Sequence, residues 1–171
     1  MTTWRIAQLA EHPQWVEQLA HWHHAQWGAL MAPWSLDDAR AELQHSASNS
    51  SAIPLTLIAF EANRDANSLD QPRLLGSVSL LASDAPEFSE YSPWLASLYV
   101  STDARGLGIG SALVRALMAQ AKQLGIPRMY LFTPGSAEIY LRQGWSIIET
   151  RSLHRQPVIL MTASPFVMDE L

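Results

Sequence analysis

A glycine-rich stretch just past the middle of the chain carries the residue types and spacing most suited to binding chemistry. In ARGLGIGSALVRAL, residues 104–117, glycine stands at every second position from Gly106 to Gly110, ahead of a long segment with an apolar stripe. Backbone N–H groups at a helix start lack intrahelical acceptors, and the helix dipole favours an anion there. Because glycine lets an anion approach the backbone closely, the pattern predicts a phosphate-binding turn, with Arg105 as an added cation.

Three kinds of phosphate-binding turn share this appearance, and a fourth interpretation is a tight turn that binds nothing. A Walker P-loop must end in Gly-Lys-Ser/Thr, and Gly110, Ser111 and Ala112 do not supply that ending. A dinucleotide fingerprint belongs at the first strand and needs an acidic residue about 20 positions later, but the next strand-like segment, residues 128–133, has no carboxylate. A diphosphate held by bare backbone amides needs neither lysine nor metal.

Two motifs at this point resemble those of a known family. The segment RGLGIG, Arg105 to Gly110, matches R/Q-x-x-G-x-G/A, the acyl-CoA motif of the GNAT superfamily of N-acyltransferases, and YLRQGW, Tyr140 to Trp145, resembles that family's Y-x-x-x-G-F/Y/W signature. The resemblance implies an α/β (α+β) fold in which helices flank a mixed, mostly antiparallel central sheet with a β-α-β core that binds CoA. It also implies one domain over residues 1–171 that acetylates an amine, with acetyl-CoA as co-substrate and no metal.

The resemblance assigns roles to residues at matching positions. Residues Leu107 to Ser111 would offer backbone amides to the diphosphate of coenzyme A, and Tyr140 would stand near the thioester sulfur. Thr133 occupies the position where the family often has an asparagine that contacts pantetheine. The full set of expected cofactor-binding residues is Leu98, Tyr99, Val100, Arg105, Gly106, Leu107, Gly108, Ile109, Gly110, Ser111 and Thr133, in which the first three form the strand edge that pairs with the pantetheine arm.

Acylation of an amine by a thioester makes three chemical demands. The amine must lose a proton, since a lysine-like amine with a pKa near 10.4 is almost wholly protonated at neutral pH. The developing oxyanion needs a donor, and a backbone N–H near Leu98 could supply it. The departing thiolate needs a proton or a hydrogen bond, for which the Tyr140 phenol is a suitable donor.

The general base is the part of this chemistry that the sequence leaves open. The strand-like segment WLASLYV, residues 94–100, has no carboxylate. Asp84, Glu87 and Glu90 lie in the preceding loop and could reach the site, although an exposed loop carboxylate is normally solvated, and Ser97 could hold a relay water. The missing strand carboxylate keeps a rival interpretation in play, a non-catalytic regulatory domain that binds acyl-CoA.

A histidine and tryptophan cluster near the N-terminus is the other chemistry-bearing group. In HWHHAQW, His21 and His24 share a helical face at i, i+3, which is not the i, i+4 spacing of a helical zinc site, so we expect no metal. We expect these histidines to be exposed or to cap a helix, ahead of a role as general base for the acceptor. Three tryptophans, Trp22, Trp27 and Trp34, either pack in the core or form a cage for a cationic amine.

Composition narrows the class of protein. The chain has 171 residues, 48% hydrophobic and 16% charged, with a net charge of −5 and no cysteine. This is a globular balance, and the acidic excess does not suit nucleic-acid binding. The absence of cysteine excludes disulfides and a cysteine nucleophile. Without a run of about 20 apolar residues or a signal peptide, we expect a cytoplasmic location and no membrane partner, with a homodimer left open.

The elements that must position these residues follow from periodicity. An apolar stripe after Pro13 predicts a helix that ends at Gly28, and Ser35 with Asp38 predicts a capping box for a second helix. Strands are predicted at residues 3–10, 54–61, 73–82, 94–100, 128–133, 145–150 and 157–163, with a helix to Gln123 after the glycine turn and a short one at 137–143. A turn-rich connection at 63–72 makes the second and third strands an antiparallel pair.

Overall fold

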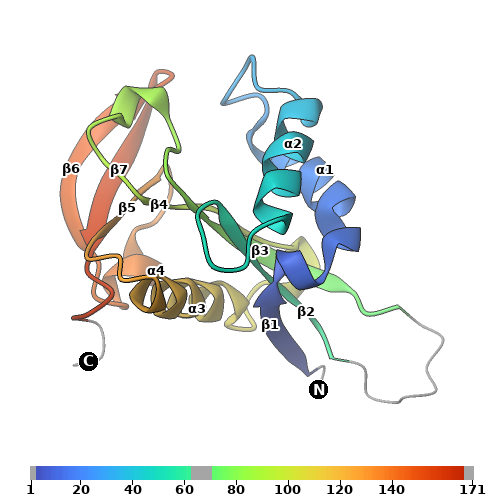
Figure 1. Cartoon of the computed structure of the whole chain (residues 1–171). Helices are drawn as coiled ribbons and strands as arrows, with labels where there is room; N and C mark the ends of the chain where they lie inside the picture. Colours follow the sequence, from blue (N-terminus) through green and yellow to red (C-terminus); the bar gives the residue numbers. More distant parts are fainter. Residues whose placement is uncertain (1–2, 63–70, 168–171) are drawn as a thin grey trace.

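The computed structural model describes residues 3–62 and 71–167, in which helices cover both faces of a seven-stranded sheet (Figure 1). The strand order is β1-β2-β3-β4-β5-β7-β6, with antiparallel neighbours except for the parallel pair β4 and β5. The strands are β1 (Trp4–Gln8), β2 (Leu55–Glu61), β3 (Leu74–Leu81), β4 (Trp94–Val100), β5 (Met129–Thr133), β6 (Ser146–Leu153) and β7 (Gln156–Ala163). The predicted mixed, mostly antiparallel sheet with a central β-α-β unit is confirmed; most of the predicted 63–72 turn lies outside the described residues.

Helices α1 (Val16–Trp27) and α2 (Leu36–Ala47) pack together against one face of the sheet. Residues Pro13–Trp15 form a 3₁₀ turn, so α1 begins three residues later than the proline predicts. The predicted capping box is present at α2, where Asp38 N–H donates to Ser35 Oγ at 3.1 Å and Ser35 N–H donates to Asp38 Oδ2 at 2.8 Å. The buried stripe of α1 meets Ile58 and Phe60 of β2 in one apolar cluster.

Helix α3 (Ile109–Gln123) covers the opposite face of the sheet (Figure 1). Its residues Leu113, Val114 and Leu117 are fully buried against β2, β3 and β4. The helix spans the range predicted from the apolar stripe and is followed by Gly125, whose φ of +73° ends it in the left-handed region. The β4-α3-β5 unit therefore places the glycine-rich stretch directly between a central strand and a helix N-terminus.

The C-terminal part builds the other half of the sheet. The short helix α4 (Glu138–Leu141) follows β5, and the chain returns as a β6–β7 hairpin in which β7 lies between β5 and β6. A third apolar cluster holds the loop between β3 and β4 against this hairpin, through Phe88 and Trp94 on one side and Leu153 and Val158 on the other. That packing determines which loop side chains face the site.

Candidate active site

The glycine-rich turn, residues 105–110, stands at the surface at the start of α3. Gly106 and Gly108 both have a φ of +79°, and a Cβ added at either would meet nothing within 4 Å. Glycine is therefore required there by left-handed backbone, and the space beside it is open to a ligand. The first helical hydrogen bond runs from Ala112 N–H to the Gly108 carbonyl at 3.1 Å, so the N–H groups of residues 109–111 precede it and suit an anion.

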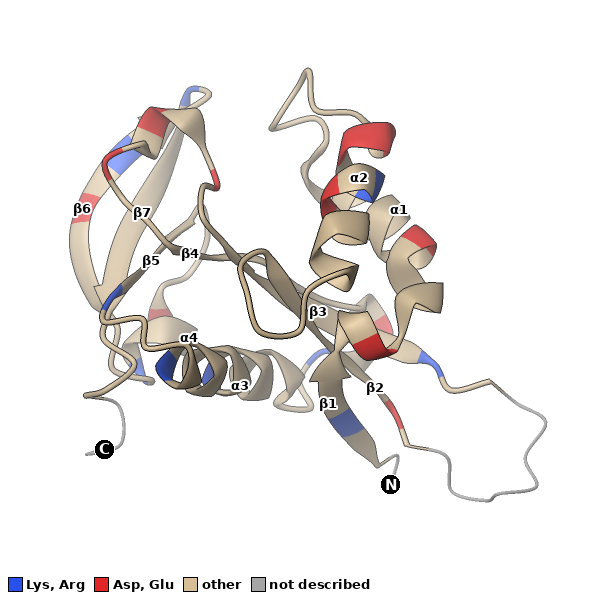
Figure 2. Cartoon of the chain, in the orientation of Figure 1, with Lys and Arg blue, Asp and Glu red and all other residues tan. Residues whose placement is uncertain are grey.

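The charges around this turn also suit an anion. The first turn of α3 has no acidic residue, and the whole helix carries Arg115 and Lys122 without Asp or Glu. The Arg105 Nε donates a hydrogen bond to the Val100 carbonyl at 3.1 Å, which ties its guanidinium to the end of β4 beside the turn. Figure 2 shows Asp and Glu on α1, α2 and the β3–β4 connection, across the sheet from α3. Asp103, just before the turn, pairs with Arg73.

Strand β4 carries a bulge that breaks its regular pairing. Ser77 pairs with Tyr99 and Ser79 pairs with Ala96, so two residues of β4, Ser97 and Leu98, lie opposite one residue of β3. Ser97 has a φ of +55°, a left-handed conformation that is uncommon for a residue other than glycine. A bulge bends its strand and leaves backbone groups outside the ladder, which makes the Leu98 region able to offer an N–H to a ligand.

Strands β4 and β5 diverge immediately after they meet. Their parallel pairing joins Trp94 to Tyr130, and within the described residues the register continues no further. A cavity of about 770 Å³ lies where they separate, lined by Leu95, Ser97 and Leu98 of β4 and by Leu131, Phe132 and Thr133 of β5. The unpaired edge of β4 is therefore free for an extended ligand, and its pairing with a pantetheine arm stays a prediction.

The predicted residues divide between the cavity and its surroundings. Leu98, Thr133 and Tyr140 line the cavity together. The Tyr99 ring lies on the other face, 5.2 Å from the Trp22 ring, so only its backbone can serve the strand edge. Thr133 Oγ1 accepts a hydrogen bond from Gly135 N–H at 3.2 Å, which commits part of its hydroxyl to the local turn.

Tyr140 presents a protonated hydroxyl to this cavity. The residue is 8% exposed, and burial raises the pKa of the phenol to about 12. Among the described residues no group hydrogen-bonds the hydroxyl. A buried phenol that stays protonated at neutral pH and faces a cavity is a hydrogen-bond donor kept for a ligand.

The three loop carboxylates have different surroundings. Glu87 lies 3.7 Å from His154 Nε2, and Glu90 pairs with Arg151, so both side chains are held against the β6–β7 hairpin. Asp84 instead lines the cavity, where burial raises the pKa of its carboxyl to about 7 and the negative charge of Glu42 adds to the effect. The expectation of a solvated carboxylate holds for Glu87 and Glu90, which are about half exposed, and is wrong for Asp84.

Two histidines of α1 have different surroundings. His21 is exposed, as expected, and its Nε2 lies 3.2 Å from Glu17 Oε1. His23 lies on the same stripe of α1 as Leu19 and Ala20 and is buried, with Nε2 2.9 Å from Ser77 Oγ, and burial lowers its pKa to about 4. The described residues hold no group of three or more histidine, cysteine or acidic side chains placed to bind a metal ion.

Two of the three tryptophans line the cavity. Trp27 and Trp34 form part of its wall, and Trp34 Nε1 donates a hydrogen bond to Glu42 Oε1 at 3.0 Å. Trp22 packs on Tyr99 instead. Trp22 and Trp34 pack against the core between α1, α2 and the sheet, and the cage for a cationic amine stays a prediction for Trp27 and Trp34.

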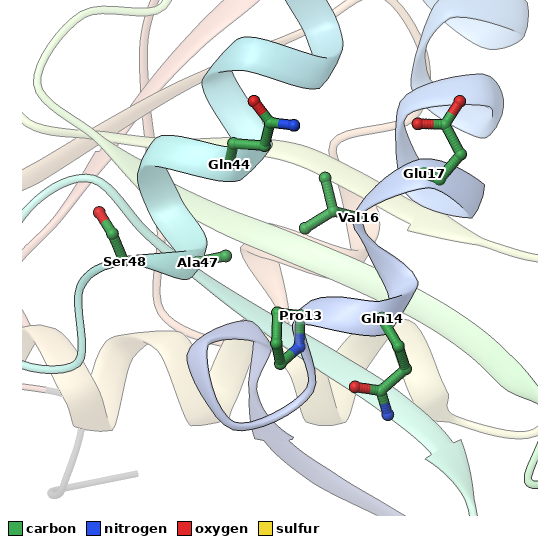
Figure 3. Close-up of a pocket in the computed structure, with 7 residues that line it drawn as sticks. All are labelled: Pro13, Gln14, Val16, Glu17, Gln44, Ala47 and Ser48. Carbon is green, nitrogen blue, oxygen red and sulfur yellow. The ribbon is translucent and has the colours of Figure 1, made fainter.

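A second hollow lies between the start of α1 and the end of α2 (Figure 3). It measures about 370 Å³, opens widely to the surface and is lined by Pro13, Gln14, Val16, Glu17, Gln44, Ala47 and Ser48. None of the predicted site residues is among them. In the described part of the chain, no helix has both the length and the apolar character needed to cross a membrane.

Comparisons with known proteins agree with this geometry. The model of the acetyltransferase (GNAT) family matches residues 16–145. No curated protein matches the sequence. Similar solved structures include an aminoglycoside 6'-N-acetyltransferase complexed with coenzyme A, at 17% identity over 94% of this chain and 97% of that one, with a TM-score of 0.65.

Two further structures have the same fold. The spermidine N-acetyltransferase from Vibrio cholerae in complex with CoA and spermine is 13% identical over 96% of this chain and 97% of its own, with a TM-score of 0.67. The protein yncA from Salmonella typhimurium with its cofactor acetyl-CoA is 16% identical over 96% and 94%, also with a TM-score of 0.67.

The chain belongs to the GNAT acetyltransferase family, because the family model matches most of its length and the fold and glycine-rich turn agree with it. It is an acetyl-CoA-dependent N-acetyltransferase, with acetyl-CoA as co-substrate. The RGLGIG and YLRQGW motifs, which supported the resemblance in the sequence, lie at the start of α3 and at α4.

Proposed function

We propose that the protein transfers the acetyl group of acetyl-CoA to the primary amine of a small cationic molecule, by direct attack within a ternary complex. The cavity between β4 and β5 carries this proposal, since one space joins the free edge of β4, the Tyr140 hydroxyl, two carboxylates and two tryptophan rings. Acidic side chains and aromatic faces both attract an ammonium group. A peptide N-terminus belongs to the same chemical class, but the acidic lining favours a small cation.

The glycine-rich turn and β4 would hold the acetyl donor. In this proposal Gly106 and Gly108 let the diphosphate reach the first N–H groups of α3, with Arg105 as a fixed cation. The pantetheine arm would then follow Leu98 to Val100 into the cavity. Binding donor and acceptor in one space provides proximity without a covalent enzyme intermediate.

The bulge and Tyr140 would act on the reacting atoms. A backbone N–H at Leu98, left outside the ladder by the bulge, would donate to the developing oxyanion. The Tyr140 hydroxyl, with its pKa raised to about 12, would donate a hydrogen bond to the departing sulfur without ionising itself. The rival interpretation, a non-catalytic domain that binds acyl-CoA, was raised because β4 has no carboxylate. Asp84 of the preceding loop lines the cavity and would supply one.

A thiol-release assay tests the proposed function. Acetyl-CoA would be offered with spermidine, kanamycin, n-butylamine and a tetrapeptide that starts with serine, and CoA release would be followed at pH 7.5. We expect turnover of at least one cationic small amine and a loss of about 100-fold or more in kcat for Tyr140→Phe, the range that acid–base groups contribute. Acetyl-CoA binding without turnover of any amine would contradict the proposal. The single-domain organisation over residues 1–171 and the cytoplasmic location stay predictions.

A further inference from the structure

Asp84 is set apart from the other carboxylates of its loop. It follows the last residue of β3, Leu81, by three positions. The loop packs on the β6–β7 hairpin through the apolar cluster that includes Phe88 and Leu153. Among residues 3–62 and 71–167 no lysine, arginine or histidine forms an ion pair with its carboxyl, and no group donates a hydrogen bond to it. A charged carboxylate that is partly buried without a partner lowers the stability of the fold. A cationic ligand in the cavity that pairs with it would offset this cost.

The cavity places this carboxyl with the groups of the proposed reaction. Asp84 shares it with Ser97 and Leu98 of the β4 bulge, with Tyr140, and with Glu42 of α2. Resting on the proposed function, we propose that Asp84 is the catalytic base, which binds the ammonium group of the acceptor and removes a proton from its nitrogen. Glu42 is a positioning residue, whose negative charge holds the ammonium in the cavity and makes Asp84 a stronger base.

The step balances as follows. One N–H bond of the bound ammonium breaks, an O–H bond forms on the Asp84 carboxyl, and the freed electron pair forms the bond from nitrogen to the acetyl carbon. The carbon–sulfur bond of the thioester then breaks, and the second proton lost by nitrogen ends on the CoA sulfur, with the Tyr140 hydroxyl as hydrogen-bond donor to it. The Asp84 proton leaves to solvent before the next turnover.

The titratable groups that line the cavity with Asp84 are Glu42 and His45 of α2 and Tyr140 of α4. Of these, Glu42 acts on the Asp84 carboxyl through its charge. Burial raises the pKa of the Asp84 carboxyl to about 7, with Glu42 as the second cause. A base is most effective when its pKa lies near the operating pH, because it is then both deprotonated and basic enough to accept a proton.

Asp84→Asn is the variant that tests the assignment, with kcat/KM measured from pH 5.5 to 9 for the amine of the panel with the highest turnover. We expect the wild type to lose activity as the pH falls through about 7, and Asp84→Asn to lose about 100-fold and to lack that acidic limb. Glu42→Gln should shift the limb to lower pH, since removal of its charge lowers the pKa of Asp84. Glu87→Gln, in the same loop but paired with His154, should match the wild type.

Hydroxylamine, which is unprotonated at neutral pH, separates proton removal from a structural role. Asp84→Asn should lose less than tenfold with this acceptor, and calorimetry should give an acetyl-CoA affinity equal to that of the wild type. Equal losses with hydroxylamine and the amine, or an unchanged acidic limb in Asp84→Asn, would overturn the base assignment while the proposed function stands. A wild type that binds acetyl-CoA but acetylates none of the amines would overturn both.

Discussion

Substitution of Gly108 by alanine isolates what the glycine-rich turn does. Gly108 is the N-cap of α3 with a φ of +79°, and a Cβ there meets no protein atom within 4 Å. The left-handed backbone costs an alanine about 1–2 kcal/mol, or about 2–4 °C in Tm for each kcal/mol in a chain of this size. The added methyl also occupies the space assigned to the diphosphate, so we expect the Kd for acetyl-CoA to rise at least about tenfold, roughly 1.4 kcal/mol.

Gly125→Ala is the matched control for this prediction. Gly125 has a φ of +73° and the same open space, but it follows the other end of the 15-residue helix α3, about 25 Å from Gly108 at 1.5 Å per residue. Both variants should lose similar stability in a thermal melt, whereas only Gly108→Ala should lose acetyl-CoA affinity in calorimetry. Equal affinities for the two variants would refute the assignment of the diphosphate to this turn.

Three further predictions concern charge and stability. Arg105→Ala should weaken acetyl-CoA binding about tenfold at low salt and less at high salt, because salt screens the attraction between its charge and the diphosphate. Arg115→Ala, at an exposed position farther along α3, should leave the affinity unchanged. Calorimetry at two salt concentrations checks both variants. Burial raises the folded pKa of Asp84 from its ordinary value of 3.8 to about 7. Stability is therefore lost as the pH rises from about 4 to about 7, where the unfolded carboxyl ionises and the folded one does not, and the loss is complete above pH 7. Asp84→Asn should therefore resist urea better by up to about 4 kcal/mol at pH 8 and equally at pH 4. Ser35→Ala should lower the free energy of unfolding by about 1 kcal/mol in the same assay, because it removes the capping box.

Local signals in the sequence predicted much of this fold. The apolar stripe of α1, the Ser35–Asp38 capping box and the glycine-rich turn each depend on residues within a few positions of one another, and all three are present. The order of β5, β7 and β6 and the exact start of α1 depend on tertiary packing or on subtle backbone geometry, which local periodicity does not contain.

The site was predictable where a motif marks it, as at the glycine-rich turn and at Tyr140, which lines the cavity. The turn at Gly106 and Gly108 was found because left-handed backbone selects glycine, but the bulge at Ser97 has no such signal, since a serine there looks like any strand residue. Asp84 could not be told from Glu87 in the sequence. What separates them is an ion-pair partner, His154, that lies more than sixty residues further along the chain.

Nuclear magnetic resonance on the ¹⁵N-labelled protein tests most directly whether the start of α3 holds the diphosphate of the acetyl donor. Titration with CoA should shift the amide resonances of residues 109–111 and of Leu98, whereas pantetheine, which lacks the diphosphate, should shift Leu98 and leave residues 109–111 in place. Saturable binding of CoA that moves resonances elsewhere, for example around the hollow at Gln14 and Gln44, with no change at residues 109–111, would contradict this account of the protein.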